Sequence, residues 1–308
     1  MAELELARQS LPNDSRIFEL TGNIHNRQGR SEEAIRLRNR ALDLDPRNVA
    51  MLQQLAVAYM RSRRYADAKS VFDRVLAIDP NDALTKAVRA GLDLNWKADT
   101  RPLHETIDSI RGTIPAAIPR IANSWLICAL AERDAAAATD ALIAESENQV
   151  SLIPSENLRF SRSFAEGVIA RMSQDNAKAQ SAFIAARAEQ EKIVEAEPNY
   201  GPAWCVLGLI DAGLGRREDA LREGRRAAEF LPVEKDKDGG TMMLKYLAMI
   251  AAWVGDKDLA CEKLASIIHR PSTLSYGDFK LMPFWDPLRG DPRFEKLVDE
   301  AKQPVALK

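Results

Sequence analysis

The sequence has few of the residues on which enzyme and metal sites usually depend. Its 308 residues include three cysteines, Cys128, Cys205 and Cys261, which lie far apart in apolar surroundings. A small, odd and scattered set is a poor disulfide framework and indicates a reducing compartment. We therefore expect each cysteine to be a small buried apolar side chain and not a reactive thiol.

Histidine is equally scarce. His25, His104 and His269 stand alone, with no histidine partner at i+4 and no cysteine close in sequence. The spacing of a metal site is missing, so we expect no metal ion. The sequence also has no phosphate loop, glycine-rich kinase loop, dinucleotide fingerprint or G-x-S-x-G elbow. We expect no cofactor, no catalytic residue and no enzymatic activity.

Long apolar runs and a charge excess of either sign are absent as well. The 43 basic and 45 acidic residues leave a net charge of -2, which gives no footprint for nucleic acid or an anionic membrane. No window holds 18 apolar residues, and the N-terminal MAELELARQ does not read as a signal peptide. Together with the cysteines, these absences predict a cytoplasmic protein that binds neither nucleic acid nor membrane.

What the sequence does have is a repeat. Pro12, Pro46 and Pro80 are each 34 residues apart, and Pro198 and Pro232 keep the same interval. A fixed period of this length indicates a repeat array. The clearest copy runs from Asn48 to Pro80, where two amphipathic helices flank a polar turn at residues 61–64. Their apolar stripes consist of Leu52, Leu55, Ala56 and Tyr59, then Ala68, Phe72 and Val75.

These residues resemble the tetratricopeptide repeat, a helix–turn–helix unit of 34 residues. Residues 201–232 fit its pattern best, with Trp204, Leu207, Gly208, Ala220 and Ala227 in register. Three positions depart from it, because Asp211, Gly224 and Arg38 stand where aromatic residues are usual. The resemblance implies an all-α, right-handed solenoid of antiparallel helix pairs, about seven in number, with a C-terminal capping helix.

The register divides the chain into five parts. We expect a partial repeat with only a second helix at residues 1–12 and two regular repeats at 13–82. A degenerate stretch follows at 83–197, then two more repeats at 198–271 and a capping segment at 272–308. Within the degenerate stretch, helical pairs are expected at 83–97 with 101–113, 118–132 with 135–147, and 158–172 with a long helix at 176–196. An irregular insertion is expected at 148–157.

The two ends carry further expectations. Half a repeat is a poor cap, so we expect a fragment of a longer polypeptide; the alternative is a natural start with a lone capping helix. Near the other end, Asp286-Pro287 and Asp291-Pro292 each predict a helix start, the second opening a helix from about 292 to 302. This stretch resembles the end of the tetratricopeptide regions in bacterial signalling proteins that carry kinase, adenylate cyclase or winged-helix modules.

Because the sequence shows no catalytic or metal motif, we expect its function to depend on a binding surface. The first helices of such pairs line a concave groove, where we expect a protein or peptide to bind. The candidate groove residues are Glu19, Asn23, Asn26, Arg27, Gln53, Gln54 and Arg61 at a polar end, and Met242, Lys245, Tyr246, Met249 and Trp253 at an apolar end. That apolar end either anchors a partner or is filled by the chain's own KLMPFW stretch.

Several functions fit such a groove. The sequence favours a non-catalytic interaction scaffold, as the accessory region of a bacterial signalling protein. The alternative is an intramolecular regulator of an attached kinase or cyclase module. A clamp for acidic chaperone tails is less favoured, because Glu19 would repel a carboxylate. The oligomeric state stays open.

Overall fold

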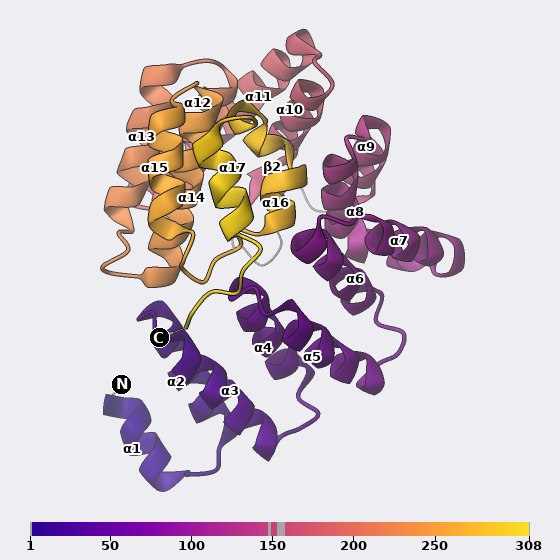
Figure 1. Ribbon diagram of the computed structural model, residues 1–308, viewed down its shortest axis with the longest axis vertical. Coiled ribbons are helices and arrows are strands. Elements are labelled where there is room, and N and C mark those ends of the chain that lie inside the picture. Colours follow the sequence, from indigo (N-terminus) through magenta and orange to yellow (C-terminus); the bar gives the residue numbers. More distant parts are fainter. Residues whose placement is uncertain (1, 147–148, 153–157, 308) are drawn as a thin grey trace.

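The protein is an α-helical solenoid, seen in a computed structural model that describes residues 2–146, 149–152 and 158–307. The described residues include seven successive antiparallel helix pairs, and each helix packs against its pair mate (Figure 1). A short helix α1 (Ala2–Ser10) precedes them. The pairs are α2 (Ser15–Arg27) with α3 (Ser31–Leu44), α4 (Val49–Arg61) with α5 (Tyr65–Ile78), α6 (Ala83–Lys97) with α7 (Arg101–Thr113), α8 (Ile118–Glu132) with α9 (Ala135–Ala144), α10 (Arg162–Met172) with α11 (Asn176–Ala196), α12 (Gly201–Gly213) with α13 (Arg217–Phe230), and α14 (Lys237–Trp253) with α15 (Lys257–Ile267).

Short polar side chains start many of these helices. The side chains of Asp14, Asn48 and Asp82 accept hydrogen bonds from backbone N–H groups in the first turns of α2, α4 and α6. These bonds satisfy donors that have no partner inside a helix. Prolines at the repeat interval follow the second helices, which end at Leu44 and Ile78, because proline cannot continue the backbone ladder.

The degenerate stretch still folds into pairs. Helices α6, α7, α8 and α11 have the expected bounds, and α11 is the long second helix that the sequence predicts. Helix α10 begins at Arg162 and not near 158, because Phe160–Ser161 forms a two-residue strand, β2, antiparallel to β1 (Gln149–Val150). Of the insertion expected at 148–157, residue 148 and residues 153–157 lie outside the described residues, and 149–152 include β1.

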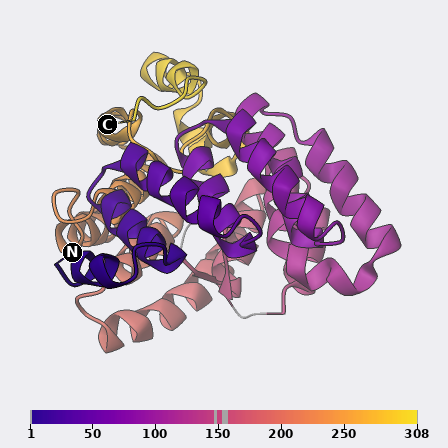
Figure 2. The same ribbon diagram turned by 90° about the horizontal axis from the view of Figure 1, so that it is seen from below.

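The C-terminal segment, residues 272–307, packs on one side of the curved row of helix pairs. In Figure 1 it lies between α14 and α6, and in Figure 2, seen from below, its yellow helices lie along one edge of the molecule. It contains α16 (Tyr276–Leu281), the 3-10 helix η2 (Pro283–Leu288) and α17 (Pro292–Glu300), and α16 packs on α6 and α8. Asp291 caps α17 as expected. Asp286, in contrast, starts no helix: it lies inside η2 and pairs with Arg133.

This segment ties the two ends of the solenoid together. The backbone N–H groups of Ser272 and Val305 donate to the carbonyl oxygens of Arg61 and Ser62, at 2.9 and 3.0 Å. The Arg63 side chain, only 4% exposed, donates to three carbonyls around the segment. The polar turn between α4 and α5 is therefore a buried junction and not a solvated loop.

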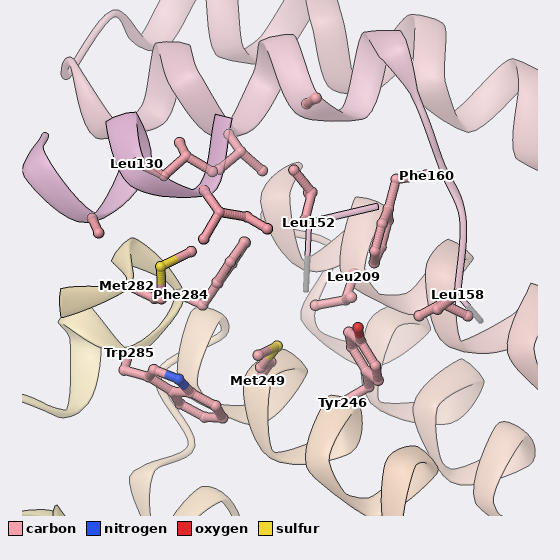
Figure 3. Close-up of a cluster of buried hydrophobic side chains, with 14 of the residues drawn as sticks. Leu130, Leu152, Leu158, Phe160, Leu209, Tyr246, Met249, Met282, Phe284 and Trp285 are labelled. Carbon is pink, nitrogen blue, oxygen red and sulfur yellow. The ribbon is translucent and has the colours of Figure 1, made fainter. Parts of the chain in front are cut away.

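The main core runs from Ala83 in α6 to Ala301 and includes side chains of the C-terminal segment, and a smaller core lies in the pairs α2–α3 and α4–α5. Aromatic rings follow one another through the main core: Phe164 contacts Phe183 and Trp253, with centroids 5.7 and 6.4 Å apart, and Trp253 stacks on Phe284 at 6.2 Å. Figure 3 shows Phe284 and Trp285 reaching the same cluster as Tyr246 and Met249. Aromatic contacts of this kind add to the apolar area buried between elements. No helix in the described part of the chain has the length and apolar character needed to cross a membrane.

Candidate partner-binding groove

An open groove lies over the first helices of the two N-terminal pairs. It encloses about 790 Å³, and α2, α4, α1 and Asp238 of α14 contribute to its walls. Six of the seven residues expected at the polar end of the concave surface line it: Asn23, Asn26, Arg27, Gln53, Gln54 and Arg61. Apolar wall is supplied by Leu20 and Val57. The periodicity of the sequence thus brings these polar side chains together on one surface.

Amide and guanidinium groups form the polar part of the groove wall. The Arg38 side chain enters it from α3 and donates from Nη2 to Asn23 Oδ1 at 3.0 Å. Gln54 donates from Nε2 to Glu19 Oε1 at 2.8 Å, which places the seventh expected residue beside the groove. Arg38 Nε, Arg38 Nη1 and Gln54 Oε1 have no hydrogen-bond partner in the described protein and lie just beneath the surface.

Burial dominates the electrostatics of Arg38. Its side chain is 6% exposed, and this burial lowers the pKa of its guanidinium, while Glu19 raises that pKa and Arg61 lowers it further. The guanidinium stays charged at neutral pH because its ordinary pKa lies far above 7. A buried cation with unused donors favours a hydrogen-bond acceptor, above all an anionic one.

Ion pairs connect the rim of the groove to the far end of the chain. Arg61 pairs with Asp238 of α14, and Arg27 lies 3.9 Å from Asp236, the residue that caps α14. Two of the basic groove residues therefore already face carboxylates of the same chain. Among the described residues, the buried donors of the groove that have no partner are Arg38 Nε and Nη1.

The apolar candidate residues lie elsewhere, inside the molecule. Lys245, Tyr246 and Met249 are each 1% exposed and Trp253 is 8% exposed, while Met242 is half-buried. Trp253 Nε1 donates to the carbonyl oxygen of Phe284 at 3.0 Å, and Lys245 Nζ donates to Thr273 Oγ1 at 2.7 Å. The C-terminal segment thus contacts Lys245 and Trp253, whereas Tyr246 packs against Phe160 of β2, beside Leu209 and Leu158 (Figure 3). The four buried residues present no surface to a partner in this structure.

Comparison with known proteins identifies the repeat. Residues 26–92 match the family model described as Tetratricopeptide repeat. This stretch is therefore similar to the tetratricopeptide repeat. The match confirms the resemblance for this stretch, which includes most of the groove.

Solved structures are similar to the chain only at a low level. A tetratricopeptide repeat protein from Parabacteroides merdae is 10% identical with a TM-score of 0.45, and the match covers 94% of this chain and 99% of that one. PilW, a type IV pilus biogenesis factor, is 16% identical with a TM-score of 0.42, over 78% of this chain and 97% of that one. MamA is 19% identical with a TM-score of 0.26, over 72% and 94%. No curated protein matches the sequence.

The structure explains the three departures from the tetratricopeptide pattern. Arg38 supplies the buried guanidinium of the groove. Asp211 is fully buried and accepts from Arg187 Nε at 2.7 Å. Gly224 leaves room for a neighbouring helix, because a Cβ there would lie 2.8 Å from Ile250 Cδ1. Arg38 is not among the groove residues expected from the sequence, although a charge at an apolar repeat position is the signal that marks it.

Burial also perturbs an acid next to Asp211. Glu223 of α13 is 3% exposed, and burial together with the Asp211 carboxylate raises its pKa to about 8. Arg222 acts in the opposite direction, and Asp219 adds to the increase. Glu223 packs inside the α12–α13 pair and lies outside the groove, so its titration affects stability and not partner binding.

Proposed function

We propose that this protein binds an extended segment of a partner protein in the groove over α2 and α4. Tetratricopeptide repeats provide a scaffold for protein–protein interaction, and none of the residues that line the groove belongs to the C-terminal segment. One observation carries the proposal. The groove wall holds Arg38, which is 6% exposed and has two donor nitrogens, Nε and Nη1, with no acceptor within the described protein.

The chemistry of the wall defines the segment. Arg38 needs acceptors, and the unused Gln54 Oε1 needs a donor. A peptide backbone offers both, and an acidic side chain offers the charged acceptor that a buried guanidinium binds most strongly. Leu20 and Val57 give apolar contact beside these groups. We therefore propose a segment with one acidic side chain flanked by apolar residues.

The wider role follows from the resemblance of the C-terminal end. We propose that the chain is the accessory region of a larger bacterial signalling protein and has no catalysis of its own. In the alternative, the bound segment belongs to the same polypeptide and the solenoid regulates an attached kinase or cyclase module. Comparing the activity of the full-length protein with and without residues 1–308 separates the two, since equal activities would contradict regulation.

A peptide selection tests the groove. Peptides that bind the wild-type chain are selected from a random display library, and their affinities are measured by fluorescence anisotropy. Replacing Arg38 with Met keeps a long apolar stem and removes the donors. We expect affinity to fall about tenfold or more, because a hydrogen bond to a charged group contributes about 1.5–3 kcal/mol.

Arg40→Met is the matched control, because Arg40 lies on the same helix with 55% of its side chain exposed. It should leave affinity within about twofold of wild type, since exposed charges contribute little. Changing the peptide's acid to its amide should reproduce the loss seen with Arg38→Met. Equal affinities for the two arginine variants, or a library that yields no binder, would contradict the proposal. Circular dichroism verifies that both variants are folded.

A further inference from the structure

Outside the groove, three side chains of metal-binding type meet between α7 and α8. Ligand atoms of His104, Cys128 and Glu132 all lie within 4.8 Å of one another. His104 Nδ1 is 2.9 Å from Glu132 Oε2. This is the one group of three or more such residues found in the part of the chain that the structure describes.

Helix geometry brings the three together. Cys128 and Glu132 are four residues apart on α8, so their side chains occupy the same face. His104 lies on α7, which packs against α8. The sequence predicts no metal site because His104 has no cysteine near it along the chain. The cysteine becomes a neighbour only when two successive helix pairs pack.

We propose that His104, Cys128 and Glu132 form a binding site for Zn²⁺. Nitrogen, sulfur and carboxylate oxygen are the ligand types that this ion takes in proteins, with bonds of about 2.0–2.3 Å in a tetrahedron. Those bonds place ligand atoms about 3.5 Å apart. Small side-chain rotations therefore bring the present group to ligand spacing.

Solvent can supply a fourth ligand. The His104 side chain is 52% exposed and Glu132 is 25% exposed, so ions and water reach the site from this side. Cys128, 2% exposed, forms the inner wall. On binding, the thiol proton leaves to solvent, and the thiolate and carboxylate together neutralise the two charges of the ion. A neutral cluster suits a half-buried position, where net charge would be costly.

A fourth residue orients the histidine. Asp108 Oδ2 lies 3.3 Å from His104 Nε2, on the side of the ring away from Glu132. Accepting the Nε2 proton leaves the Nδ1 lone pair for the ion, and metal-binding histidines commonly have such a carboxylate behind them. Asp108 is also one helical turn from His104, so α7 supplies both the ligand and its support. We assign Asp108 as the positioning residue of the site.

Titration with Co²⁺ tests the ligands directly, because a cobalt–thiolate bond gives a charge-transfer absorption that carboxylates and histidine do not. The full chain is prepared without a histidine tag and freed of metal. We expect one ion per chain with a thiolate band, displaced by Zn²⁺. Cys128→Ser should abolish the band, and His104→Ala and Asp108→Asn should each weaken binding about 10- to 100-fold.

Cys261→Ser is the matched control, since Cys261 is also a buried helical cysteine, 5% exposed. This variant should keep the wild-type band and affinity. The proposal is overturned if the wild type shows no thiolate band, if the band survives in Cys128→Ser, or if Asp108→Asn binds as tightly as wild type. Circular dichroism of each metal-free variant confirms that any loss of binding does not reflect unfolding.

Discussion

Replacing Arg63 with Ala should loosen the C-terminal segment from the α4–α5 turn. Arg63 Nη2 donates to the Ile268 carbonyl at 2.7 Å and Nε donates to the Leu274 carbonyl at 3.0 Å. A third contact, from Nη1 to the Gln303 carbonyl, is longer at 3.4 Å. One side chain thus binds three points of the chain more than 200 residues away.

The loss in the free energy of unfolding depends on the carbonyl acceptors that Arg63→Ala leaves without a donor. A buried carbonyl without a donor costs about 1–3 kcal/mol, and two of the three contacts are short. Against this, the variant no longer buries a charge, since burial lowers the pKa of the Arg63 guanidinium and so opposes its charged form. We expect a net loss of about 2–4 kcal/mol in the free energy of unfolding.

Urea denaturation followed by circular dichroism measures this loss. Arg64→Ala is the matched control, because the neighbouring Arg64 side chain is 38% exposed, pairs with Asp67 and lies 4.6 Å over the Tyr59 ring. Its replacement should cost less than about 1 kcal/mol, since exposed ion pairs and exposed cation–π contacts contribute little. Hydrogen exchange adds a local measurement: the N–H groups of Ser272 and Val305 should lose protection in Arg63→Ala alone.

Two results would refute this reasoning. One is an Arg63→Ala chain as stable as Arg64→Ala. The other is unchanged protection of Ser272 and Val305 in an otherwise destabilised chain. Arg63→Gly would separate a backbone effect, because Arg63 has a left-handed φ of 56° that glycine adopts without strain.

Further predictions concern the packing of α16 and a buried acid. Gly277→Ala places a Cβ 1.7 Å from the Leu94 carbonyl oxygen and should lower the free energy of unfolding, measured by urea denaturation, by about 2–3 kcal/mol. Gly112→Ala, with open space around it, is the control and should be neutral or stabilising, so equal effects of the two changes would contradict the clash. Burial raises the pKa of Glu223 to about 8 from 4.5, so the folded chain holds a proton that the unfolded chain loses between these values, and stability should fall as pH rises through that window. The stability of Glu223→Gln should match that of wild type near pH 5 and exceed it by a few kcal/mol near pH 9, on the order expected for such a pKa shift. Parallel profiles of stability against pH for the two proteins would contradict this.

Local features of the sequence predict much of the fold. The 34-residue interval and the apolar stripes identify the helix pairs, since each depends on residues close together in the chain. The contacts between the C-terminal segment and the earlier helix pairs have no such local pattern in the sequence. Ser275 Oγ donates to Asn95 Oδ1 at a separation of 180 residues, and the repeat period does not predict this contact. Asp286 is wrongly expected to start a helix for a related reason, because its side chain is engaged by Arg133 from a distant pair.

The candidate site divides in the same way. Register predicts that Asn23, Gln53 and Gln54 share a surface, and they line one groove. Their binding of a partner stays a prediction. The same register puts Tyr246 and Trp253 on a concave face, but it cannot say what covers that face. Sequence spacing does not predict the proposed zinc site, because His104 and Cys128 come together only through packing of α7 on α8.

The junction between the two ends also limits how this protein can change in length. An open solenoid gains or loses a repeat with little effect elsewhere, because each repeat contacts only its neighbours. Here Arg61 of α4 pairs with Asp238 of α14, and α2 packs on α14. One helix pair more or fewer between them would move these partners apart. The contacts of α2 and α4 with α14 therefore fix the number of helix pairs between them. We expect insertions to be tolerated in outward-facing loops, but not the addition of a whole helix pair.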